Sequence, residues 1–153
     1  MNNKVAIILG SENDKKYIED SFKYFDYFNV KFEVHVISAH RNPNEVGVFA
    51  SEAHKNGYKI LIGSAGMAAH LAGALKAHSI LPVIGVPLPG GISDGMDALL
   101  STVQMPKGVP VATMSVGKHG MINAAILSAE ILALNNSEIS TKLIEFKKIG
   151  ARI

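Results

Sequence analysis

Polar side chains suited to ligand binding and proton transfer gather in three short segments, each of which follows an apolar run and precedes a helical pattern. The segments are residues 10–14, 38–43 and 63–70. Serine hydroxyls and an arginine can bind phosphate, a carboxylate can bind sugar hydroxyls, and imidazole can move protons. In an open parallel sheet such loops lie at the carboxyl edge, where these folds bind ligands. The spacing therefore predicts one shared site.

The first segment is suited to the phosphate and the sugar of a nucleotide-like ligand. Ser11 follows Gly10 at the end of an apolar run and precedes a helix, whose unpaired amides and dipole favour an anion. The alternative is that Ser11 or Asn13 only caps the helix. Asp14 would repel phosphate but accepts hydrogen bonds from sugar hydroxyls, so we assign it to ribose. Its alternative role is a first-turn acid that complements the helix dipole.

The second and third segments supply the proton-transfer candidates. Arg41 presents a planar fork of donors for phosphate, and Ser38 is a further donor; an ordinary exposed loop arginine is the alternative. His40 is the best acid or base, because imidazole titrates near neutrality, and polar surface is its alternative. His70 follows small residues such as Gly66, whose backbone amides can approach a ligand, although a buried structural histidine would look the same.

Composition and spacing exclude several other classes of function. The chain has 153 residues, 48% of them hydrophobic, a net charge of +2 and no cysteine, which fits one cytoplasmic domain without thiolate or disulfide chemistry. No charge run favours nucleic acid or a membrane surface, no signal peptide starts the chain, and no apolar run would span a bilayer. The glycines match neither a dinucleotide nor a triphosphate loop, and the remaining histidines lack metal-ligand spacing, so we expect no metal. These four histidines are His35, His54, His78 and His119.

Five strand-like runs alternate with helical patterns and predict a three-layer α/β/α sandwich around a parallel sheet. The expected strands are residues 5–9, 32–37, 59–62, 81–86 and 109–114. The first two expected helices begin near Asn13 or Asp14 and at Pro43, and the third continues through Ala77. The last three span residues 97–105, 121–134 and about 137–150. The whole of residues 1–153 is predicted to be one domain.

The last two helices suggest contacts between subunits. Residues 121–134 are apolar almost all the way round, which predicts cover on more than one side. The terminal helix places Ile139, Leu143, Phe146 and Ile149 near one stripe. We interpret this pair as subunit-contact material, with the terminal helix packing on a neighbouring subunit; packing within the chain is the alternative.

The sequence motifs resemble those of the PurE family over nearly the whole chain. The motifs are Gly10-Ser11-x-x-Asp14, Ser38-Ala39-His40-Arg41-x-Pro43, Ala68-Ala69-His70-Leu71-x-Gly73 and Gly95-x-Asp97-x-Leu99-Leu100-Ser101-x-Val103-Gln104-Met105-Pro106. The third and fourth look like the class I enzymes of this family, the N5-carboxyaminoimidazole ribonucleotide mutases of purine biosynthesis.

The resemblance implies a flavodoxin-like subunit, a homo-octamer with sites at subunit junctions, a ribonucleotide substrate and no cofactor. It also implies that Ser11, Asp14 and Arg41 bind the ribotide with Ser38 and Asn13 nearby, that His40 handles protons, and that His70 positions the reacting group. The implied reaction is an isomerisation: carbon dioxide leaves the exocyclic nitrogen, stays enclosed by the loop of residues 65–69, and is captured by ring carbon 4. A PurE-like carboxylase acting on aminoimidazole ribonucleotide or another ribotide, and a non-catalytic ribonucleotide-binding protein, are the alternatives.

The chain departs from the common family pattern at four positions near the site. Asn13 replaces a serine, Asn42 a threonine, Met67 a glycine and Ala72 a proline. Met67 has the greatest consequence, because a glycine there would serve a positive backbone angle or a close ligand approach. We therefore expect Met67 to strain the loop or to fill the pocket.

Overall fold

One parallel sheet is built from β1 (Lys4–Leu9), β2 (Lys31–Val36), β3 (Tyr58–Ala65), β4 (Val83–Pro87) and β5 (Ala112–Thr113). The strand order is β2-β1-β3-β4-β5, and each neighbouring pair is parallel. This is the order of flavodoxin-like folds, which confirms the predicted fold class. The computed structural model describes residues 4–153, so the first three residues of the predicted domain lie outside the described part.

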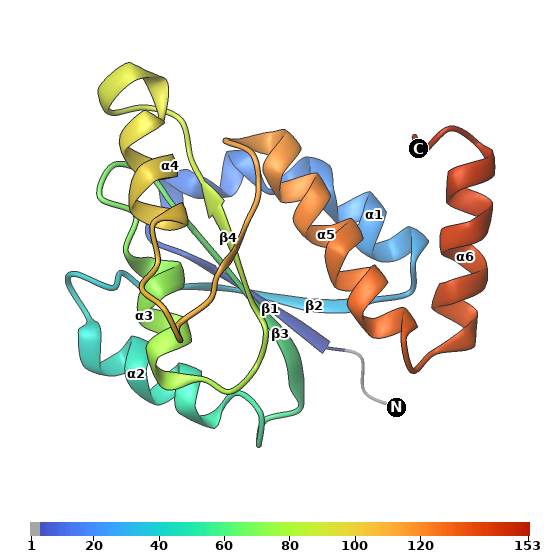
Figure 1. Ribbon diagram of the computed structural model, residues 1–153, viewed down its shortest axis with the longest axis horizontal. Coiled ribbons are helices and arrows are strands. Elements are labelled where there is room, and N and C mark those ends of the chain that lie inside the picture. Colours follow the sequence, from blue (N-terminus) through green and yellow to red (C-terminus); the bar gives the residue numbers. More distant parts are fainter. Residues whose placement is uncertain (1–3) are drawn as a thin grey trace.

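Helices cover both faces of the sheet and complete the sandwich (Figure 1). One face carries the helices that follow β2, β3 and β4, and the other carries those that follow β1 and β5. The first group is α2 (Pro43–Glu52), α3 (Leu71–His78) and α4 (Met96–Val103); the second is α1 (Phe22–Tyr27) and α5 (Lys118–Ala133), with α6 (Ser137–Lys148) outside them. Three short 3-10 helices complete the chain: η1 (Glu12–Tyr17), η2 (Glu19–Ser21) and η3 (Ile92–Asp94).

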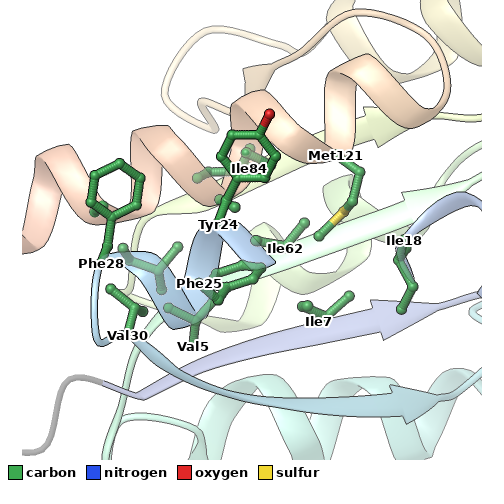
Figure 2. Close-up of a cluster of buried hydrophobic side chains, with 14 of the residues drawn as sticks. Val5, Ile7, Ile18, Tyr24, Phe25, Phe28, Val30, Ile62, Ile84 and Met121 are labelled. Atoms are coloured by element: carbon green, nitrogen blue, oxygen red, sulfur yellow. The ribbon is translucent and has the colours of Figure 1, made fainter. Parts of the chain in front are cut away.

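Each face of the sheet has its own hydrophobic core, because successive side chains of a strand point to opposite faces. On β1, Ile7 belongs to the core under α1 and α5, whereas Ile8 belongs to the core under α2 and α3. Figure 2 shows the first of these cores, in which Phe25 and Phe28 pack over the strands. The continuous apolar run of β1 is therefore buried on both sides, as its pattern predicts.

The first helical segment differs from its prediction. Instead of one α-helix from Asn13 or Asp14, the chain forms η1 and η2, and α-helical geometry begins only at Phe22. The backbone bonds are of the shorter type, such as Ile18 N–H to Lys15 O, and the Ser21 hydroxyl also donates to the carbonyl of Ile18. A serine that bonds its own backbone in this way competes with the α-helical pattern.

The fifth strand is also shorter than predicted. Only Ala112 and Thr113 pair with β4, although the sequence predicts a strand over residues 109–114. Pro110 has no N–H to donate to the ladder, so the sequence before Ala112 cannot pair as a full strand. Met114 N–H still donates to Gly85 O at 2.9 Å, so the chain follows β4 for one residue more.

The apolar character of α5 is explained within the chain, because α6 packs on it from outside while its other side faces the sheet. Phe146 of α6 is buried and contacts the rings of Tyr24, Tyr27 and Phe28. The predicted contact of α6 with a neighbouring subunit therefore stays a prediction. The apolar surface of α5 does not by itself require such a contact. No helix within residues 4–153 is both long and apolar enough to cross a membrane.

Close backbone packing brings α3 against β3 and generates the first prediction. A Cβ added to Gly63 would lie 2.8 Å from Cα and 3.0 Å from N of Ala72. We expect Gly63→Ala to lower the free energy of unfolding by about 1–3 kcal/mol, because α3 must move away from the strand. Urea unfolding measures the change.

Gly47→Ala is the matched control, since a Cβ there would meet the His78 ring at an ordinary 3.5 Å. In the helical position of Gly47 we expect alanine to stabilise the protein by about 0.5–1 kcal/mol. Equal effects of the two substitutions would contradict the packing argument.

Candidate functional site

The three predicted segments leave neighbouring strands at the same level. Leu9 at the end of β1 pairs with Val36 of β2 on one side and with Ser64 of β3 on the other. The chain order reverses at β1 and β3, which makes this edge the topological switch point of the sheet. The loops are therefore adjacent at the place where folds of this type bind ligands.

The first loop wraps tightly around the end of β1. Ser11 caps η1, because its Oγ accepts a hydrogen bond from the Asn13 N–H at 3.3 Å. Asn13 is exposed and Asp14 is half-buried. A Cβ on Gly10 would lie 3.6 Å from Cβ of Ala65 and 3.8 Å from Oδ2 of Asp14, so the Asp14 carboxylate lies close to Gly10, just after β1. Partial burial raises the pKa of the Asp14 carboxyl above its ordinary value.

The second loop forms a compact turn that starts at Ser38. Its Oγ accepts the Arg41 N–H at 3.3 Å, and its carbonyl accepts the Asn42 N–H at 2.8 Å. These bonds hold the turn closed, and the side chains of His40 and Arg41 are exposed at its tip. The guanidinium of Arg41 is thus available to an anion.

The two histidines that the sequence singled out are in direct contact. Nε2 of His40 lies 2.7 Å from Nδ1 of His70, and the ring planes meet at 86°. His40 comes from the loop after β2, whereas His70 precedes the first residue of α3. The two residues are thirty positions apart in the chain, so only the parallel sheet brings them together.

A hydrogen bond between two imidazole nitrogens limits the protons that the pair can carry. One nitrogen must donate an N–H and the other must accept it with a lone pair. The bond therefore survives when both rings are neutral or when one ring carries an extra proton, but not when both are imidazolium. One ring nitrogen of each histidine is thus engaged in the pair, while Nδ1 of His40 and Nε2 of His70 lie outside the bond.

The third loop is fixed by α4. The Ala69 N–H donates to Oγ of Ser101 at 2.9 Å, and the His70 N–H donates to Ala68 O at 2.9 Å. These two amides are hydrogen-bonded within the protein. They are therefore not free for a ligand, although the small residues of the loop predicted free amides here. Gly66 is half-buried against the segment after β4, with Cβ of Leu88 3.7 Å from where its own Cβ would stand.

Met67 occupies a backbone conformation that favours glycine. Its φ angle is +53° and its side chain is 66% exposed. The predicted positive backbone angle is therefore present. Because its side chain is exposed, Met67 strains the backbone of the loop and does not fill a buried space.

The other four histidines lie in or beside β2, α2, α3 and α5. His35 is half-buried and lies 3.0 Å from the Tyr58 hydroxyl, and His54 and His119 are exposed. Lys118, at the start of α5, forms an ion pair with Asp20 at 3.0 Å. Within residues 4–153 no three histidine, cysteine or acidic side chains are grouped in a way that could hold a metal ion.

Comparisons with known proteins agree with the motifs. A sequence model of the family described as AIR carboxylase matches residues 4–152. The N5-carboxyaminoimidazole ribonucleotide mutase of Escherichia coli K12 is 43% identical over 145 residues, which cover 95% of this chain and 86% of that protein. The protein of the same name from Bacillus subtilis 168 is 46% identical over 141 residues, covering 92% and 87%.

A solved structure resembles the whole fold. The crystal structure of Treponema denticola PurE superposes with a TM-score of 0.86 at 26% sequence identity, covering 97% of this chain and 91% of that one.

The strain at Met67 generates a second prediction. We expect Met67→Gly to raise the free energy of unfolding by about 0.5–1 kcal/mol, because the relief of left-handed strain exceeds the added freedom of the unfolded chain. Met67→Ala removes the exposed side chain but keeps the strain, so its effect should stay within about 0.5 kcal/mol. Denaturant titration of both variants is the measurement, and equal stabilisation by glycine and alanine would contradict the strain.

Proposed function

The chain belongs to the AIR carboxylase family, and we propose that it is an N5-carboxyaminoimidazole ribonucleotide mutase that forms 4-carboxy-5-aminoimidazole ribonucleotide. Relatives that bear the mutase name match nearly the whole chain. The observation that carries the proposal is the contact between His40 and His70 at the switch point of the sheet. A paired imidazole at such an edge is suited to proton transfer on a bound ribonucleotide.

The phosphate and ribose of the substrate are assigned to the first two loops. Arg41 and the Ser38 hydroxyl would bind phosphate from one side, and Ser11 with the amide side chain of Asn13 from the other. Asp14 would accept hydrogen bonds from ribose hydroxyls, which replace the water that its partial burial removes. Gly66, in the turn before His70, would lie beside the imidazole ring of the substrate.

The chemistry moves a carboxylate from nitrogen to carbon within one bound molecule. His40 as imidazolium gives a proton to the exocyclic nitrogen, the N–C bond breaks, and carbon dioxide is released beside the ring. Carbon 4 then attacks carbon dioxide with the electron pair of its enamine, and the proton of carbon 4 returns to His40. His40 ends as imidazolium again, so no external base is consumed, and the transferred carboxyl group comes from the substrate itself, so no ATP is needed to activate it.

Carbon dioxide has no charge for Arg41 to hold, so its capture depends on enclosure by the loop of residues 65–69. Retained carbon dioxide reacts as part of one complex instead of by diffusion, and such proximity is worth up to about 7–11 kcal/mol of the barrier. His70 would keep the His40 ring oriented through their hydrogen bond.

We further propose a homo-oligomer, an octamer by resemblance, with sites at subunit junctions. On α4, Met96, Leu100 and Val103 are 49%, 53% and 45% exposed and share one face of the helix. This apolar face belongs to the helix that holds the His70 loop. In size exclusion at micromolar concentration we expect a species well above the 16.3 kDa of one chain, and a monomer-sized peak would contradict the assembly.

The decisive experiment follows ribotide isomerisation by absorbance, starting from the N-carboxylated substrate without ATP or added bicarbonate. We expect turnover by the unaltered protein, and loss of at least about 100-fold in kcat for His40→Asn with ribotide binding retained, because a positioned acid contributes that much. His54→Asn is the matched control, since His54 is exposed beyond α2 and should leave kcat unchanged.

Three other outcomes would overturn parts of this proposal. Near-normal kcat in His40→Asn removes the proton-transfer role. Product formation only from aminoimidazole ribonucleotide with bicarbonate identifies a carboxylase. Tight ribotide binding without either conversion identifies a binding protein.

A further inference from the structure

Ser101 connects α4 to the loop that carries His70. Its Oγ accepts the Ala69 N–H at 2.9 Å and lies 2.6 Å from the carbonyl oxygen of Asp97, one helical turn earlier. The carbonyl oxygens of Met67 and Ala98 are farther away, at 3.3 Å each. Ser101 stands in the last turn of α4, where a serine is not needed for helix formation.

A hydroxyl group has one proton and two lone pairs, which determines how these contacts are shared. The shortest contact takes the proton, so Ser101 donates to Asp97 O and its rotamer is locked against the helix. A lone pair then points at the Ala69 N–H. Alanine at this position would keep the helix but leave the Ala69 amide without that acceptor.

The amide that Ser101 holds is adjacent to His70 in the chain. The turn also contains Met67 at a positive φ, a conformation that persists only when the surroundings impose it. The Ala69 side chain is 3% exposed, so the turn is anchored on both sides of its backbone. The next residue then directs its imidazole to His40 at 2.7 Å.

We propose that Ser101 is a positioning residue, which clamps the turn of residues 67–69 to α4 and thereby holds His70 within hydrogen-bond distance of His40. The inference rests on the proposed function, since it concerns the orientation of the proposed proton-transfer pair. The hydrogen bonds of Ser101 go to backbone atoms of the turn and of α4 and not to either imidazole, so Ser101 would act on His70 through the turn, chiefly through the Ala69 amide.

The test compares Ser101→Ala with Ser128→Ala by the absorbance assay. Ser128 is the matched control, because its hydroxyl also bonds the carbonyl one turn earlier, at 2.7 Å, but on α5 and away from the loop. We expect Ser101→Ala to lower kcat by about 10- to 100-fold, since a small misplacement of a reacting group has that effect, with KM changed less than about threefold. Ser128→Ala should keep the kcat of the unaltered protein.

A double-mutant cycle separates positioning from general destabilisation. If Ser101 acts through His70, then Ser101→Ala in a His70→Asn background should change kcat by less than about threefold. Multiplication of the two single effects would overturn the proposal. Ser101→Cys keeps the branching of the side chain but supplies only a weak acceptor, so it should resemble alanine.

A measurement without substrate distinguishes failure of this inference from failure of the proposed function. In the ligand-free protein, the Ala69 amide should exchange with solvent at least about tenfold faster in Ser101→Ala than in Ser128→Ala. Unchanged exchange, or unchanged kcat in an enzyme that is otherwise active, refutes the role of Ser101. Faster exchange in a protein that converts no ribotide keeps the clamp and refutes the function.

Discussion

The site depends on the fact that three neighbouring parallel strands end at the same height in the sheet. Because Leu9 is in register with both Val36 and Ser64, the chain leaves β1, β2 and β3 at one height and must turn there. Each turn exposes backbone and polar side chains at the edge, where the sheet itself no longer pairs them. A shift of one residue in either register would reverse the side chains of a strand and separate the loops.

Packing between the layers then decides where each loop points. Gly63 has no side chain, so Ala72 approaches its backbone and α3 lies close to β3. Ser101 of α4 accepts a hydrogen bond from the turn that precedes α3. The position of His70 at the start of α3 therefore depends both on α4 and on the packing of α3 against β3. The exposed contact between His40 and His70 is therefore supported by buried, closely packed structure beneath it.

The residues that differ from the family pattern have different structural effects. Asn13 is exposed, and its backbone N–H donates to the Ser11 hydroxyl, a bond that does not depend on the side chain at position 13. Met67 carries a positive φ at the turn that precedes His70. Its hydrophobic side chain lies on the surface beside the proposed site, where a ligand or a neighbouring subunit could cover it.

The sequence by itself determined the succession of strands and helices along the chain, the parallel sheet and the loops that hold the candidate site residues, because alternating apolar runs and loop residues are local signals. It also identified His40 and His70 as separate candidates. The direct bond between them, the 3-10 geometry after Ser11, the cover of α5 by α6 and the connection from Ser101 were decided only by the tertiary structure. Those features depend on distances between residues remote in the chain, and hydrophobic periodicity carries no information about such distances.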